Sequence, residues 1–300
     1  MSVILKSLAL AASMAIGSAA IAATPDGKGM TPKSPVEAAG VSTQLKMNIK
    51  YHGGAVMNKA EGTNVYYIWY GDWSGDTATS ILTTMMQNVT GSGWYNTNTT
   101  YYGGSKTAPV YVTNKVNYKG ATTDSYTYGT ALSDAQIQQV VANAISSGRV
   151  PKDDNAIYFV LTSKDVTATS GFCSQYCGWH NHATIAGADI KYSFVGNAAT
   201  QCASGCITSA IQTKSPNNNP GADGMASVVM HELVEAISDP DLNAWSDTIG
   251  QENADKCAWK FGTTKASANG SVYNVNFGTG QYLIQQNWSA AGTQGCKTTM

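Results

Sequence analysis

The stretch PGADGMASVVMHELVEAISDP at residues 220–240 combines an apolar helical pattern with several charged side chains. Its apolar residues recur at helical intervals, Asp223 can cap the amino end, and Pro240 ends the pattern. At about 3.6 residues per turn, His231 and Glu235 lie one turn apart on the same face. This stretch therefore predicts a core-facing helix that brings an imidazole and a carboxylate together.

The segments around this helix predict alternating strands and helices, which indicates an α+β (mixed α/β) fold with a mixed sheet. A capping box at Ser133-Asp-Ala-Gln136 marks the start of one helix. Strands are expected at 64–70, 156–161 and 190–195, hairpin strands within 101–118, and helices at 77–89 and 133–148. We expect one domain over residues 46–300.

The first residues have the features of a signal peptide. Lys6 precedes an apolar run at residues 7–16, and small residues follow up to Ala23. The run is shorter than the roughly 20 residues that a membrane-spanning helix needs. We predict a signal peptide at 1–23, a flexible leader at 24–45, and secretion to the extracellular space or the periplasm.

Six cysteines lie in the predicted mature chain, and an even number in an exported protein indicates disulfides. Spacing alone does not fix their pairing. We expect Cys173–Cys177, Cys202–Cys206 and Cys257–Cys296, with a zinc knuckle as the alternative use of the thiols.

The balance of charge limits the partners of the protein. The formal net charge is -1 at pH 7, so the chain lacks the long-range attraction that basic proteins have for nucleic acid or anionic lipid. We expect no nucleic-acid partner and no membrane partner after signal cleavage. A monomer that acts on a peptide or a cell-wall substrate is predicted.

His231-Glu232-x-x-Glu235 resembles the His-Glu-x-x-His helix of the zincin metallopeptidases, with glutamate in place of the second histidine. The resemblance implies a single zincin-like domain with an active-site helix and disulfide-braced loops. In it, His231 and Glu235 bind Zn²⁺ and Glu232 is the general base on a metal-bound water. Glu252 is the expected third ligand. Other carboxylates that could take this place are Asp239, Asp241, Asp247 and Asp255. The alternative is a surface helix with ordinary acidic residues.

A second polar cluster is Cys177-Gly-Trp-His-Asn-His182. If this segment is extended, His180 and His182 lie on one face, because side chains alternate along a strand. They could complete the metal site or polarise a substrate carbonyl, so both are candidate catalytic residues. Alternatively, they form hydrogen bonds within a disulfide-braced loop.

Motifs along most of the mature chain carry a second resemblance. They include Tyr51-His-Gly-Gly54, Tyr67-Ile-Trp-Tyr-Gly71, Cys177-Gly-Trp-His180, Cys202-x-x-x-Cys206 and Gly221-Ala-Asp-Gly-Met225. These motifs are similar to those of the EXORDIUM or phosphate-induced protein family, and the His-Glu pair suggests its bacterial branch. The resemblance implies an extracellular or cell-wall location but supplies no substrate.

Three functions follow from these observations. The predicted function is a secreted metal-dependent hydrolase of the zinc metallopeptidase class. The alternative is a non-enzymatic extracellular protein that binds cell wall or glycan through its many tyrosine, tryptophan and asparagine side chains. The third is a structural Ca²⁺ site, since hard cations prefer oxygen ligands. Its ligands would be Asp239, Asp241, Glu252 and Asp255.

Overall fold

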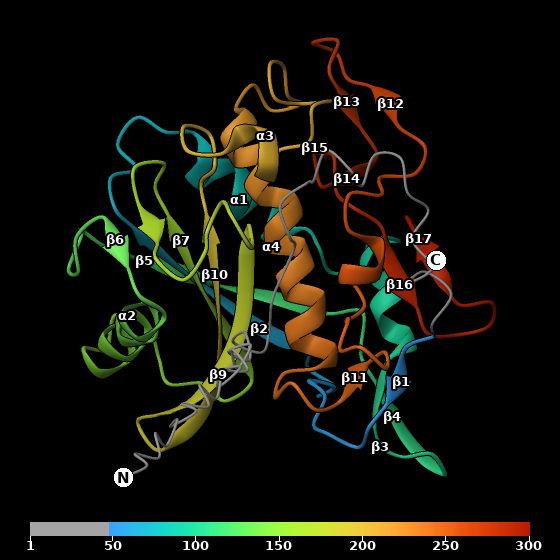
Figure 1. The fold of residues 1–300 in the computed structure, drawn as a ribbon. Helices are drawn as coiled ribbons and strands as arrows, with labels where there is room; N and C mark the ends of the chain where they lie inside the picture. Colours follow the sequence, from blue (N-terminus) through green and yellow to red (C-terminus); the bar gives the residue numbers. More distant parts are fainter. Residues whose placement is uncertain (1–47) are drawn as a thin grey trace, which may run out of the picture.

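The computed structural model describes residues 48–300 (Figure 1). The predicted signal peptide at 1–23 and leader at 24–45 lie outside the described residues. No helix between residues 48 and 300 has both the length and the apolar character needed to cross a membrane.

A five-stranded mixed sheet in the order β5-β2-β7-β10-β9 forms the centre of the fold. Its strands are β2 (Thr63–Tyr70), β5 (Val116–Asp124), β7 (Ala156–Thr162), β9 (Gly178–Ile185) and β10 (Ala188–Gly196). Neighbouring strands are parallel except β9, which pairs antiparallel with β10 at one edge. β2, β7 and β10 are almost continuously buried, as parallel strands covered on both faces are. The three predicted core strands are confirmed.

Helices cover this sheet. They are α1 (Ala78–Gln87), α2 (Asp134–Ser146), the short α3 (Ala203–Cys206) and α4 (Pro220–Ser238). α2 packs against β7 and β10, whereas α4 packs against β9, β10 and α1. Figure 1 shows α4, in orange, running along the sheet beside β9. The predicted mixed α/β fold is therefore confirmed.

The start of α2 follows from its first side chains. The Ser133 hydroxyl accepts a hydrogen bond from the backbone N–H of Gln136, and the Gln136 side chain accepts one from the backbone N–H of Ser133. These reciprocal bonds satisfy donors that the first helical turn leaves unpaired. The predicted capping box is confirmed.

The start of α4 differs from the prediction. Asn219 is the capping residue, because its side chain accepts a hydrogen bond from the backbone N–H of Ala222, and Pro220 takes the first helical position. Asp223, the expected cap, lies within the first turn. There its carboxylate accepts hydrogen bonds from Asn217.

The other strands are short ribbons rather than parts of the main sheet. They pair as β1 (Lys50–Tyr51) with β11 (Trp245–Ser246), β3 (Tyr102–Ser105) with β4 (Ala108–Tyr111), β6 (Ala131–Leu132) with β8 (Thr167–Ala168), β12 (Lys265–Ala266) with β13 (Val272–Tyr273), β14 (Val275–Phe277) with β15 (Gly280–Tyr282), and β16 (Asn287–Ser289) with β17 (Gly295–Lys297). The β3–β4 pair is the predicted hairpin. Two 3₁₀ helices, η2 (Tyr95–Thr100) and η3 (Asp255–Cys257), connect these ribbons to the core.

Two of the three expected disulfide pairs differ from those in the structure. Cys173 bonds to Cys202 and Cys177 bonds to Cys206, so the local pairings are wrong. The reason is topological: β9 and β10 are antiparallel, so the chain entering β9 and the chain leaving β10 meet at the same end. The predicted Cys257–Cys296 bond is confirmed. All six cysteines are paired, which also excludes the zinc knuckle.

Candidate functional site

Helix α4 lies inside the protein, not on its surface. All of its residues after Pro220 are buried, including His231, Glu232 and Glu235, each with no exposed surface. Sheet strands cover the helix on one side, and η2 and β15 pack on it as well. The surface-helix alternative is therefore wrong, and the charged side chains of α4 face a protein interior.

Close approach of β9 to α4 brings the two elements into one site. A Cβ atom on Gly178, the first residue of β9, would lie 2.6 Å from Cγ1 of Val228 in α4. Only glycine permits this spacing without a shift of the helix. Two residues further along β9, the fully buried His180 faces the carboxylates of α4.

Six side chains gather between α4, β9 and η3, and we call them the buried centre. They are His180, His231, Glu232, Glu235, Glu252 and Asp255. Glu252 and Asp255 come from the segment that leads into η3. The three predicted metal ligands, His231, Glu235 and Glu252, all lie in the buried centre, but His231 and Glu252 do not share one group of ligand atoms. Asp255, predicted only as an alternative ligand, joins His231 and Glu235 instead.

The distances divide the buried centre into two groups that share Glu235. In the first, Nε2 of His231 lies 3.1 Å from Oε1 of Glu235 and 3.4 Å from Oδ1 of Asp255. In the second, Nε2 of His180 lies 3.2 Å from Oε2 of Glu252 and 4.0 Å from Oε2 of Glu235. Each oxygen of Glu235 therefore faces a different histidine.

Gln285 orients the imidazole of His231. Its Oε1 lies 3.1 Å from Nδ1 of His231, and its Nε2 donates to the backbone carbonyl of Ala254 at 2.8 Å. Because the amide nitrogen is committed to that carbonyl, Oε1 is the group that accepts a hydrogen from Nδ1. The Nε2 atom of His231 is then left facing the carboxylates. The sequence offered no signal for Gln285, since no motif includes it.

Burial and mutual repulsion raise the pKa of three carboxyl groups of the buried centre, those of Glu232, Glu235 and Glu252. Burial, together with the charge of Glu235, raises the pKa of Glu232 to about 8. Burial and the nearby Asp255 likewise raise the pKa of Glu235 to about 8. Burial and the charge of Asp239 raise the pKa of Glu252 well above its usual range. Burial opposes the charged form of His231, but Glu235 and Asp255 raise its pKa.

Several polar atoms of the buried centre have no hydrogen-bond partner within the described chain. They are both carboxylate oxygens of Glu232, Oε2 of Glu235, Oε1 of Glu252, Nδ1 of His180 and Nε2 of His231. Buried polar atoms are nearly always hydrogen-bonded in folded proteins. Carboxylate oxygens and imidazole nitrogens are metal ligands, so these residues could hold a cation.

Other acidic residues that were predicted as possible ligands make interactions outside the buried centre. Asp239 ends α4, and its Oδ1 accepts from the backbone N–H groups of Asn243 and Ala244. Asp247 pairs with the buried Lys256 at 2.8 Å. The expected four-carboxylate Ca²⁺ site is not brought together among residues 48–300.

His182 belongs to a separate, partly exposed cluster. The predicted extended segment is confirmed as β9, which places His180 and His182 on one face. However, Nδ1 of His182 lies 2.9 Å from Oδ1 of Asp189 and 3.8 Å from Oδ1 of Asp241. Lys191 also pairs with both carboxylates, and its ammonium takes the place that a cation would need. His182 therefore does not join the buried centre.

A second candidate site lies on the short ribbons β1–β11 and β3–β4. We call it the aromatic surface: Tyr51, Tyr102, Tyr111 and Trp245. Ring centroids of successive members lie 5.1 to 5.5 Å apart. Tyr111, at the tip of this set on β4, is 51% exposed, and the neighbouring Val110 is 54% exposed. Both residues belong to the β3–β4 hairpin, which extends from the body of the protein in Figure 1.

A cleft of about 490 Å³ lies near the aromatic surface, and its lining includes residues 55–59, 154–155 and 187–189 together with Lys191 and Asp241. Asn58 of this lining reaches the β3–β4 hairpin, because its Nδ2 donates to the carbonyl of Val110, the neighbour of Tyr111, at 2.7 Å. Aromatic contacts with glycan were predicted from composition, but their position could not be, because the rings come from β1, β3, β4 and β11.

The matching family model and the similar proteins agree on one family for this chain. The model of the family "Phosphate-induced protein 1 conserved region" matches residues 49–299. The chain is 30% identical to Protein EXORDIUM-like 5 of Arabidopsis thaliana, over 87% of this chain and 82% of that protein. It is 31% identical to Protein EXORDIUM-like 3 of the same plant over 81% of each chain, and 28% identical to Protein PHOSPHATE-INDUCED 1 of Nicotiana tabacum over 66% of each. No solved structure matches the chain.

These relatives overturn the predicted main function. The matched family and the similar proteins are EXORDIUM-like and phosphate-induced proteins, not metallopeptidases, so the zinc metallopeptidase prediction is wrong. A zincin-like domain is likewise not confirmed, since no solved structure matches. A catalytic role for Glu232, His180 or His182 depends on that hydrolase and stays a prediction. The predicted resemblance to the family is confirmed, and with the disulfides it is consistent with an extracellular protein.

Proposed function

Because the chain belongs to the phosphate-induced protein 1 family, we propose that it is a secreted, non-enzymatic protein that binds polysaccharide of a cell wall. Its three disulfides support export, because such bonds persist in oxidising compartments. The basic and apolar pattern of residues 1–23 supports the same location.

The observation that carries the proposal is the exposed ring of Tyr111 near the cleft, backed by the half-buried Tyr51 and Tyr102 and the buried Trp245. An aromatic ring offers a flat apolar face, and a tyrosine adds a hydroxyl at its edge. A sugar ring has a similar division, with C–H groups on its faces and hydroxyls around its rim. Tyr111 supplies the exposed face, and Tyr51 and Tyr102 support it from behind through ring contacts.

The charges of the cleft favour an uncharged polysaccharide. Lys59 pairs with Asp154 at 3.3 Å, and Lys191 pairs with both Asp189 and Asp241. The lysines are thus neutralised by carboxylates of the cleft itself and leave no positive surplus for an anionic chain. The same side chains and Asn58 offer donors and acceptors to hydroxyl groups.

The test is a binding assay with the purified protein and three polysaccharides. These are insoluble cellulose, a soluble mixed-linkage β-glucan and the anionic polygalacturonate. We expect retention by at least one uncharged polymer, and we expect the recovered polymer to keep its chain length. Tyr111→Ala should weaken binding by at least about tenfold, which corresponds to about 1.4 kcal/mol.

Tyr273→Ala is the matched control. Tyr273 is a partly exposed tyrosine on β13, which lies at the opposite end of the molecule from β3 and β4 in Figure 1. The Tyr273→Ala variant should bind the polysaccharides as strongly as the unmodified protein does. Equal binding by the Tyr111 variant, absence of binding to both uncharged polymers, or a shortened polymer would each contradict the proposal.

A further inference from the structure

We propose that the buried centre holds two divalent cations bridged by the carboxylate of Glu235. His231 and Asp255 complete the ligands of one ion, and His180 and Glu252 complete those of the other. The cations are structural. This inference is independent of polysaccharide binding, because the buried centre and the aromatic surface consist of different residues.

The bridging position of Glu235 follows from the distances. The two groups of potential ligands share this one residue, and its Oε1 faces His231 while its Oε2 faces His180. A tetrahedral ion with ligand distances of about 2.0–2.2 Å holds its donor atoms roughly 3.3–3.6 Å apart. The observed separations of 3.1 and 3.4 Å around His231, and of 3.2 Å between His180 and Glu252, are close to that spacing, whereas the 4.0 Å between His180 and Oε2 of Glu235 is longer.

Charge supports two ions rather than one. The buried centre contains four carboxylates, those of Glu232, Glu235, Glu252 and Asp255. When all four are ionised, two divalent cations offset their charge, whereas without a cation Glu232, Glu235 and Glu252 are held toward their neutral forms. Burial of an unbalanced carboxylate costs several kcal/mol, so the fold strongly favours such compensation.

Several buried atoms of these ligand residues have no hydrogen-bond partner among the described residues. Oε2 of Glu235 and Oε1 of Glu252 are buried without hydrogen bonds, as is Nε2 of His231. His231 supplies a donor to one group, Glu252 supplies one to the other group, and Glu235 belongs to both. Glu232, with both oxygens unpartnered, lies outside both groups and contributes charge rather than a direct ligand.

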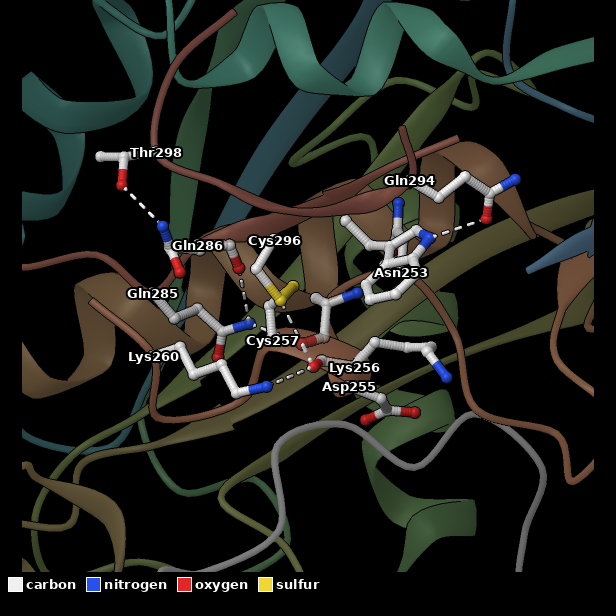
Figure 2. Close-up of a disulfide and its surroundings, with 12 residues drawn as sticks. Asn253, Asp255, Lys256, Cys257, Lys260, Gln285, Gln286, Gln294, Cys296 and Thr298 are labelled. Atoms are coloured by element: carbon white, nitrogen blue, oxygen red, sulfur yellow. Dashed lines mark hydrogen bonds between the residues drawn. A yellow bond between two sulfur atoms is a disulfide. The ribbon is translucent and has the colours of Figure 1, made fainter. Parts of the chain in front are cut away.

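The surroundings hold the ligands in place. The backbone N–H of Asp255 donates to Oε1 of Glu235 at 3.0 Å, and the backbone N–H of Glu252 donates to Oδ2 of Asp255 at 3.2 Å. Figure 2 shows Asp255 near the Cys257–Cys296 disulfide, which fastens η3 to β17, with Gln285 in the same region. Hydrogen bonds of this kind orient ligands before a metal ion binds.

The ligand types define the class of cation. A mixed set of imidazole and carboxylate donors suits Zn²⁺ or Mn²⁺ better than Ca²⁺, which prefers oxygen alone. The two ions join β9, α4 and the start of η3, which are far apart in sequence. In this arrangement they stabilise the attachment of the C-terminal ribbons to the sheet.

The experiment measures metal content by mass spectrometry after reconstitution of the mature protein with Zn²⁺ and gel filtration. We expect two ions per chain, one in His180→Ala, one in Asp255→Asn and none in Glu235→Gln. The control is His182→Ala, the neighbouring histidine on β9, which should keep both. Removal of the metal with a chelator should lower the melting temperature by about 10 °C.

A spectroscopic measurement on the unmodified protein keeps the proposal testable if a variant does not fold. Electron paramagnetic resonance of the Mn²⁺-loaded protein should show the exchange-coupled spectrum of two bridged ions. A spectrum of isolated Mn²⁺, fewer than two ions per chain, or a melting temperature that the chelator leaves unchanged would overturn the proposal.

Discussion

The Nε2 atom of His231 lies 3.1 Å from Oε1 of Glu235, one turn along α4, with both side chains fully buried. On a surface helix such a pair contributes only a few tenths of a kcal/mol. Here it lies between a sheet and the C-terminal ribbons, where charged groups need strong compensation. Cation binding by this pair is our proposal, whereas the relatives of the chain argue against its use in peptide hydrolysis.

Gln285 should tune the affinity of the buried centre for metal. It holds Nδ1 of His231 through its Oε1, so Gln285→Ala removes the orientation of a ligand without removing the ligand. We expect a Zn²⁺ affinity about 10- to 100-fold weaker, measured by competition with a chromophoric chelator. Gln286→Ala is the control, because that side chain bonds to Thr298 instead. Equal affinities of the two variants would contradict the role of Gln285.

Gly178 should set the distance between β9 and α4. In Gly178→Ala the new Cβ atom would meet Cγ1 of Val228 at 2.6 Å and the carbonyl oxygen of Phe194 at 2.9 Å. We expect a loss of about 1–3 kcal/mol in the free energy of unfolding, measured in urea, because such overpacking forces the core to shift. Gly93→Ala is the control. Its Cβ would first meet Thr299 at 3.4 Å, so a similar loss there would show that the effect is not specific to the β9–α4 contact.

The Cys257–Cys296 disulfide should stabilise the segment that carries Asp255. It closes a sequence separation of 39 residues, and loop-closure entropy for that length corresponds to about 4 kcal/mol. We expect the double variant Cys257→Ala/Cys296→Ala to lose about this much in urea unfolding. A loss below about 1 kcal/mol would mean that the ribbons hold η3 in place without the bond.

The local parts of the fold could be predicted from sequence because their signals are local. Apolar runs predicted β2, β7 and β10, and the Ser133 capping box predicted the start of α2. The spacing of His231 and Glu235 likewise predicted their contact, because one helix contains both.

Non-local relationships could not be predicted in this way. The Cys173–Cys202 bond depends on the antiparallel pairing of β9 with β10, which no spacing of cysteines reveals. The contact of His180 with Glu252 joins residues 72 positions apart. The aromatic surface could not be predicted either, because its rings come from ribbons that are far apart in the chain.

Polysaccharide binding at the aromatic surface can be measured by hydrogen–deuterium exchange with and without the soluble β-glucan. We expect slower exchange on binding in residues 102–111 and 55–59, where Tyr111 and the cleft lie, and unchanged exchange in β12 and β13. Protection confined to other segments, or no protection at a glucan concentration that saturates retention of the protein, would contradict it.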